Sequence, residues 1–174
     1  MNVLQILASP RPESFTSALA SAFKEGAIGA GNQVCTYNVF DNRDSDDQIK
    51  EAICKADHIC FAWPCMWEMP PAKLVDFLQT TFVKGFAFDE VDGTMVPRLK
   101  TPVTCLVSMG QRKKLNTTNL VEAFRYCGMY PQFLVFENVG PRMSELEALR
   151  NLDSAKNRGS RITKLNGKGS YDYT

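Results

Sequence analysis

A continuous apolar run opens the stretch ICFAWPCMWEMPP, which covers residues 59–71, and the run ends at Pro64. Five apolar residues in succession, closed by a proline, predict a strand that is buried on both faces of a parallel sheet. The loop after such a strand lies at its carboxyl end, where open α/β sheets bind their ligands. This loop carries Met66, Trp67 and two further prolines. Large flat side chains on a proline-stiffened loop are suited to a planar aromatic ligand.

Four more strands are predicted around this one, and a helical pattern follows each strand. The predicted strands cover residues 3–8, 35–39, 58–63, 103–107 and 133–136. The helical patterns begin at Phe15, Asp46, Pro71, Asn116–Thr118 and Ser144, the last with a capping box to Glu147. Apolar and polar residues alternate in the second strand, which suits the edge of a sheet. Right-handed crossovers then predict a doubly wound α/β fold, a five-stranded parallel sheet in the flavodoxin-like order 2-1-3-4-5.

The connection over residues 84–101 shows no persistent period, and we predict no helix or strand there. Phe82, Phe86 and Phe88 flank it, and we expect a monomer to expose much of this apolar group. Exposed apolar patches usually mark contacts, so the group predicts dimerisation.

Length and charge suggest a single soluble domain. The 174 residues predict one domain over residues 1–165 and a flexible tail over residues 166–174. A formal net charge of +1 provides no field that would recruit nucleic acid. No apolar run approaches the roughly 20 residues of a membrane span, and residues 1–8 lack the features of a signal peptide. We therefore expect a cytoplasmic protein that neither inserts into a membrane nor binds nucleic acid.

The cysteines and the histidine do not predict a metal site. Six cysteines are scattered without a Cys-x-x-Cys pair, and we expect reduced, mostly buried thiols. The single histidine, His58, opens the central strand at the end away from the ligand loops, so we interpret it as structural.

The turn from Ser9 to Thr16 joins the first strand to the first helix and predicts a phosphate site. A helix N-terminus offers unpaired N–H groups and a partial positive charge. Ser9, Ser14 and Thr16 add hydroxyl donors, and Arg11 adds a full charge. The turn has no Gly-x-Gly-x-x-Gly, which argues against a dinucleotide fingerprint. An ordinary serine-capped helix would explain the turn as well.

The fourth strand ends in Ser108-Met109-Gly110-Gln111, next to the Trp67 loop in the predicted strand order. Gly110 allows the backbone to approach a ligand closely, although a plain turn is the simpler alternative. Three strand-end loops thus converge on one crevice: a phosphate cradle, an aromatic loop and a glycine turn. A monophosphorylated planar cofactor fits that arrangement.

The sequence resembles a known family in three places: residues 8–15 (ASPRPESF), residues 64–71, and Phe82 with residues 85–88 (GFAF). These segments are similar to the flavodoxin-like NAD(P)H:quinone oxidoreductases, a group that includes the modulator-of-drug-activity and potassium-efflux ancillary proteins. The resemblance covers roughly residues 1–140.

The resemblance implies a homodimer with FMN, or alternatively FAD, at the subunit interface. It implies NAD(P)H as co-substrate and a quinone, azo or nitro compound as the small-molecule electron acceptor. Because the flavin carries the hydride chemistry, no side chain has to act as a catalytic acid or base. A rival hypothesis, suggested by the potassium-efflux ancillary proteins, is a non-enzymatic flavin-binding regulatory or interaction subunit.

By position, the resemblance assigns site residues on each loop. Phosphate contacts fall on Ser9, Ser14, Phe15 and Thr16, to which the first turn adds Arg11. The flavin ring would be lined by Pro64, Cys65, Met66, Trp67, Ser108, Met109 and Gly110. The candidate substrate-binding residues are Trp67, Glu68, Arg112, and Phe88 contributed by the other subunit.

This chain also departs from the family pattern. Glu68 stands where an aromatic residue often follows the family's tryptophan, and Gln111 replaces a second glycine. The tyrosine and histidine that some members carry beyond that turn are absent, and residues 112–116 (RKKLN) follow directly. These departures concern quinone reduction more than flavin binding.

Two of the candidate residues have a second interpretation. Cys65 is either a redox thiol or a residue that packs against flavin. Arg112 and the two lysines after it either hold a nicotinamide phosphate or form a solvated basic loop.

Overall fold

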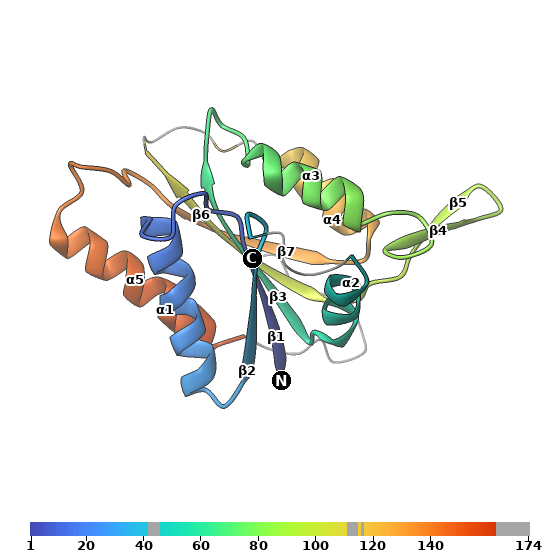
Figure 1. Ribbon diagram of the computed structural model, residues 1–174, viewed down its shortest axis with the longest axis horizontal. Helices are drawn as coiled ribbons and strands as arrows, with labels where there is room; N and C mark the ends of the chain where they lie inside the picture. The colour runs from blue at the N-terminus through green and yellow to red at the C-terminus, as the bar shows by residue number, and fades with distance from the viewer. Residues whose placement is uncertain (42–45, 111–114, 116, 163–174) are drawn as a thin grey trace.

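A five-stranded parallel sheet with helices on both faces forms the body of the protein, and a two-stranded hairpin projects from it (Figure 1). The computed structural model describes residues 1–41, 46–110, 115 and 117–162. In chain order the elements are β1 (Asn2–Leu7), α1 (Phe15–Gly29), β2 (Gln33–Asn38), α2 (Asp46–Lys55), β3 (His58–Cys65), α3 (Ala72–Thr81), β4 (Phe88–Val91), β5 (Thr94–Pro97), β6 (Pro102–Met109), α4 (Thr118–Tyr126), β7 (Tyr130–Phe136) and α5 (Glu145–Ser160). Among the helices so described, none has the length and apolar character needed to cross a bilayer.

The strand order is β2-β1-β3-β6-β7, and every neighbouring pair in this sheet is parallel. Counted within the sheet, this is the order 2-1-3-4-5, so the predicted topology is confirmed. The proposed domain boundary at residue 165 and the tail after it stay predictions, because residues from 163 on lie outside the described part of the chain.

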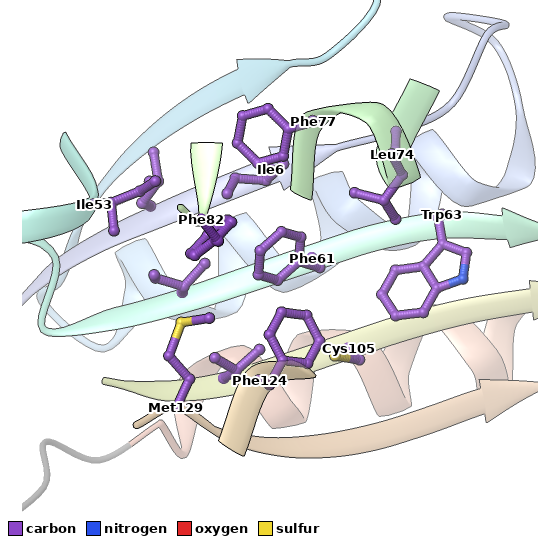
Figure 2. Packing of buried hydrophobic residues seen from close by; sticks show 14 of the residues in the cluster. Ile6, Ile53, Phe61, Trp63, Leu74, Phe77, Phe82, Cys105, Phe124 and Met129 are labelled. Carbon is purple, nitrogen blue, oxygen red and sulfur yellow. The ribbon is translucent and has the colours of Figure 1, made fainter. Parts of the chain in front are cut away.

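β3 lies at the centre of the sheet and supplies both faces of the core. Its residues from His58 to Trp63 are all buried. Phe61 and Trp63 pack with Leu74 and Phe124 on the face covered by α2, α3 and α4 (Figure 2). Cys60 and Ala62 contribute to the other cluster, which α1 and α5 cover. This burial on both faces is what the unbroken apolar run predicts.

Several element ends also match their sequence signals. The capping box of α5 is present, with Ser144 accepting from the backbone N–H of Glu147 and the Glu147 side chain accepting in return. Gly128 follows α4 with a positive φ of 81°. Pro71, predicted as the first helical residue, is instead the N-cap of α3, which begins one residue later at Ala72.

The hairpin β4–β5 is the element that sequence reasoning missed. Its two strands pair in antiparallel fashion within the segment for which we predicted no strand. Asp92 and Gly93 form its turn with φ angles of 52° and 74°. Asp-Gly is a favoured sequence for such a two-residue turn, and this dipeptide was the available signal.

Two expectations about burial were wrong. Phe82 is only 9% exposed and packs against Phe61 and Phe77, while Phe86 and Phe88 are half-buried, so the phenylalanine group is largely covered within one chain. Only three of the six cysteines are buried; Cys35 and Cys54 are exposed, because they lie on the outer sides of an edge strand and a surface helix.

A close crossing of α1 and α5 covers one face of the sheet. A Cβ placed on Gly26 would lie 1.9 Å from the backbone oxygen of Lys156, and one on Gly159 would lie 2.0 Å from the backbone oxygen of Phe23. Backbone atoms cannot yield as a flexible side chain does. The two glycines therefore set the distance between the helices.

We expect Gly26→Ala and Gly159→Ala each to lower the free energy of unfolding by about 1–3 kcal/mol, because overpacking strain exceeds the gain in helix propensity. Gly29→Ala is the matched control, since nothing lies within 4 Å of a Cβ at that helical position. Urea denaturation measures all three variants. Equal stability of Gly26→Ala and Gly29→Ala would contradict the close crossing.

Candidate functional site

A crevice of about 440 Å³ opens at the carboxyl ends of β1, β3 and β6. The loop after β1 with the first turn of α1, the end of β3 and the end of β6 all line it. The lining residues are Ser9, Pro10, Arg11, Ser14, Phe15, Thr16, Pro64, Cys65, Met66, Ser108, Met109, Gly110 and Val139.

Hydroxyl groups tie the polar side of the crevice together. The Oγ atoms of Ser9 and Ser14 lie 2.6 Å apart, and Thr16 Oγ1 lies 2.6 Å from Ser108 Oγ. The second bond joins residues 92 positions apart in the sequence, and both of its side chains are buried. It therefore fixes the start of α1 against the end of β6.

The N-terminus of α1 faces this hydroxyl cluster. Ser14 is the N-cap, and its Oγ accepts a hydrogen bond from the backbone N–H of Ser17. The first turn of α1 contains no acidic residue, whereas Asp46 and Asp47 begin α2 and two glutamates lie in the first turn of α5. The positive end of the α1 dipole is thus not offset from within its own first turn, which favours an anion at this place.

The side formed by β3 is more apolar. Pro64 and Cys65 end β3, and Met109 ends β6 as the register partner of Cys65. Burial raises the pKa of the Cys65 thiol; a hydrogen bond from the backbone N–H of Glu68 opposes this rise, and the Glu68 carboxylate adds to it. The raised pKa keeps the thiol protonated and fits a packing role better than a reactive one.

Gly110 lines the crevice directly after β6. A Cβ at this position would meet the backbone oxygen of Val139 at 3.6 Å, which is an ordinary contact. The packing of the protein itself therefore does not require a glycine here. The lack of a side chain lets a ligand approach the backbone closely at this position.

A tight turn directly follows the apolar wall. Met66 and Met69 exchange two backbone hydrogen bonds of 2.8 and 2.9 Å, so Trp67 and Glu68 alone form the turn. Both adopt left-handed backbone angles, with φ of 54° and 65°. That conformation destabilises a residue that has a side chain by about 1–2 kcal/mol, and here the cost applies to both Trp67 and Glu68. The turn leaves Trp67 90% exposed at the rim.

Sequence reasoning missed the loop after β7. Val139 lines the crevice because its N–H donates to the Met109 oxygen at 2.8 Å. The preceding Asn138 has a φ of 59°, an angle that asparagine tolerates better than most residues. The same loop helps to line a second cavity of about 700 Å³, which shares Arg11, Ser14, Phe15 and Val139 with the crevice.

Every predicted cofactor-binding residue except Trp67 lines the crevice. Trp67 and Glu68 lie beside it on the exposed turn. Phe88 lies elsewhere in its own chain, on the hairpin, where its ring contacts Tyr126 edge-on. Arg112 and the two lysines after it lie outside the described residues. The binding roles themselves stay predictions.

His58 lies at the amino end of β3, away from the crevice, as expected. It is buried and its Nε2 lies 2.9 Å from Thr104 Oγ1, while its ring stacks on Phe23. These contacts fit a structural role. Within the described part of the chain, His, Cys, Asp and Glu side chains form no cluster of three or more that could hold a metal.

Several solved structures share this arrangement at low sequence identity. An azoreductase from Bacillus anthracis str. Sterne superposes with a TM-score of 0.79 at 15% identity, covering 93% of this chain and 100% of its own. An NAD(P)H:quinone oxidoreductase from Methanothermobacter marburgensis gives 0.78 at 20% identity, with 92% and 98% covered. An FMN-dependent NADH-azoreductase from Bacillus anthracis str. Ames Ancestor, solved in complex with FMN, gives 0.72 at 14% identity, with 92% and 99% covered. These likenesses show the fold alone.

A search of the curated proteins found none that matches this sequence. The family described by its flavodoxin-like fold, however, matches residues 1–157, which is most of the chain. The strand order, the crevice at the carboxyl ends of the strands and this match agree with one another. The chain therefore belongs to the family of proteins with the flavodoxin-like fold.

Proposed function

We propose that this protein is a flavin-dependent NAD(P)H oxidoreductase that reduces a quinone, azo or nitro compound. The observation that carries the proposal is the two-sided crevice, in which a hydroxyl-lined helix N-terminus faces an apolar wall at the ends of three parallel strands. The solved structures of similar fold support it, because their names describe quinone and azo reductases, one of them with bound FMN.

The residues of the crevice fit a flavin phosphate at one end and a flavin ring at the other. The N–H groups of the first turn of α1, with Ser9, Ser14 and Thr16, would hold the phosphate. Pro64, Cys65, Met66, Met109 and Gly110 would hold the ring and exclude water from one face of it. When bound, the flavin supplies the hydride chemistry, taking a hydride from reduced nicotinamide and passing two electrons to the acceptor.

The side chains of the crevice have little acid–base chemistry to perform. Among the described residues, the lining includes no histidine, aspartate or glutamate, and its thiol, Cys65, has a raised pKa. The net reaction joins NAD(P)H, one proton and a quinone to give NAD(P)⁺ and a hydroquinone, and solvent can supply that proton. The protein's part is to orient the two reactants and to exclude water.

We propose FMN as the cofactor, with FAD as the alternative. The absence of a glycine-rich fingerprint and the size of the crevice suit a mononucleotide. The neighbouring cavity of about 700 Å³ begins at Ser14 and Arg11, and it gives the adenylate half of FAD a place to lie. The mass of the released cofactor distinguishes the two.

We also propose a homodimer. The reason is no longer the phenylalanine group but the exposed apolar side chains of the turn after β3. Met66, Trp67 and Met69 are 48%, 90% and 61% exposed on one short turn. Apolar side chains gathered at this density usually meet a ligand or a partner. A second subunit would close the crevice from the side that this chain leaves open.

We expect the protein to retain FMN or FAD through desalting, and to oxidise NAD(P)H with menadione as acceptor. The crevice provides both an anion site and an apolar wall, which is the reason for expecting retention. A visible spectrum and steady-state kinetics measure the two properties. A protein that binds no flavin at saturation would refute the proposal, whereas bound flavin without turnover would favour the regulatory alternative.

We expect Ser14→Ala to weaken FMN binding by at least about tenfold, because the phosphate loses a charge-assisted hydrogen bond. Ser144→Ala is the matched control, since Ser144 caps α5 as Ser14 caps α1 but does not line the crevice. Each variant loses a cap worth about 1 kcal/mol of stability. Fluorescence titration should show a weaker flavin affinity in Ser14→Ala only; an equal affinity in both variants would place the phosphate elsewhere.

The two tryptophans provide a further test. We expect Trp67→Ala to leave the free energy of unfolding within about 0.5 kcal/mol, because the side chain is 90% exposed. Trp63→Ala should cost about 3–5 kcal/mol, because that ring is buried in the core cluster that includes Leu74 and meets Phe133 edge-on. Loss of ring stacking in Trp67→Ala should lower kcat/KM for the acceptor by about two- to tenfold. Unchanged kinetics would mean that Trp67 does not touch the substrate.

A further inference from the structure

Two exposed apolar features lie at the two ends of α3. The turn after β3, residues 66–69, precedes this helix and carries exposed methionine and tryptophan side chains. At its other end, α3 borders a cavity of about 360 Å³, which we call the α3–α4 groove. Helix α4 and the start of the β4–β5 hairpin complete the groove (Figure 1). The apolar side chains that line it include Leu78, Phe82, Phe88, Ala123 and Tyr126.

The exposed turn and the hollow groove can serve as the two halves of one contact. In a dimer with two-fold symmetry, every contact between different patches is made twice. A two-fold axis that crosses α3 near its middle brings the turn of each copy to the groove of the other. Methionine suits such a contact, because its flexible side chain fills irregular apolar gaps, and Met69 is 61% exposed on the turn.

The charges on α3 fit the same axis. Lys73 and Asp76 are exposed and three positions apart, so they are neighbours on one face of the helix. Within the described part of the chain, neither side chain forms an ion pair. An axis that crosses α3 between them places each Lys73 against the partner's Asp76. Counted outward from that axis, Met69 is roughly level with the partner's Thr80, at the groove end of α3.

Lys73 is unfavourably placed for α3 alone. It lies in the first turn of the helix, where the dipole favours negative charge, and this turn contains no acidic residue. A carboxylate supplied from outside the chain would offset this cost.

We propose that the turn after β3, the exposed face of α3 and the α3–α4 groove form one surface that binds a second copy of this chain, with the two α3 helices antiparallel. The inference rests on the homodimer proposed above and names the surface that forms it. Met69 of each copy enters the partner's groove, and Lys73 pairs with the partner's Asp76. Phe88 lines the groove, so the partner's Phe88 comes to lie beside the turn at the crevice.

The experiment exchanges the two charges and measures the dimer dissociation constant of the full chain by analytical ultracentrifugation, with and without added FMN. Lys73→Glu or Asp76→Lys alone sets like charges against each other at two places in each dimer. We expect each single variant to raise the dissociation constant by about fivefold or more. The double variant Lys73→Glu, Asp76→Lys restores opposite charges and should return to within about twofold of the wild type.

The controls make the same changes in net charge elsewhere. Asp153 and Lys156 are also exposed and three positions apart, but they lie on α5, which covers the other face of the sheet. Lys156→Glu matches Lys73→Glu, and Asp153→Lys matches Asp76→Lys. Both controls should leave the dissociation constant within about twofold of the wild type. Added salt should narrow the difference between Lys73→Glu and the wild type.

A second pair of variants tests the apolar half of the surface. Met69→Ala should raise the dissociation constant by about tenfold or more, because two methionine side chains leave the grooves of each dimer. Leu149→Ala on α5 is the matched control, since Leu149 is 60% exposed and Met69 61%. The control should dimerise like the wild type. The turn itself is held by backbone hydrogen bonds between positions 66 and 69, which Met69→Ala leaves in place.

The outcomes separate this inference from the proposed function. A chain that sediments as a monomer at micromolar concentration overturns the inference. So does a double variant that dimerises no better than the single variants, or an equal effect of Lys73→Glu and Lys156→Glu. If these results come with flavin binding and turnover, the inference alone fails. A dimer that shows the expected charge rescue but binds no flavin supports the surface and defeats the oxidoreductase function.

Discussion

The parallel alignment of β1, β3 and β6 is the constraint on which the rest of the structure depends. Ala62 of β3 is the register partner of both Leu7 and Leu106, so the three strands are held side by side near their carboxyl ends. Because they run the same way, their following loops must all emerge at one edge of the sheet. The N–H of Ala8, just beyond β1, still donates to the Ala62 oxygen at 2.8 Å, which ties the start of the turn from Ser9 to Thr16 to β3. The crevice follows from this alignment before any side chain is considered.

Local signals were sufficient to predict the body of the fold. The apolar run at residues 59–63 predicts the central strand because a strand buried on both faces has no polar position, and the alternation at residues 35–39 predicts the edge strand β2. The hairpin β4–β5 was not predicted, because four-residue strands are too short to establish a period and Asp92-Gly93 was their only marker. Packing between residues that are far apart in the sequence could not be predicted either. Phe82 and Phe88 were expected to be exposed, but Phe61 and Tyr126, which cover them, lie about 20 to 40 positions away in the sequence.

The candidate site was predictable to a similar extent. The three loops could be brought together from strand order alone, and all but one of the predicted cofactor residues line the crevice. Val139 could not be found in this way, because its place depends on long-range contacts, namely the hydrogen bond from its N–H to the Met109 oxygen and the packing of its side chain against the core. The position of Trp67 could not be found either. Its exposure follows from a left-handed turn that the sequence Trp-Glu does not suggest, since glycine or asparagine normally occupies such positions.

The two sides of the crevice together determine how a ligand can lie in it. The hydrogen bond between Thr16 and Ser108 joins segments that are 92 residues apart and so fixes the hydroxyl side. The positive end of the α1 dipole attracts an anion to this side. The opposite side ends in a short turn whose two residues, Trp67 and Glu68, adopt left-handed backbone angles. This turn places an indole and a carboxylate at the rim. A ligand with a phosphate at one end and a flat ring at the other therefore has one favourable orientation, with its ring toward Trp67 and Glu68. In that orientation, a molecule that reacts with the ring would approach past the exposed side chain of Trp67.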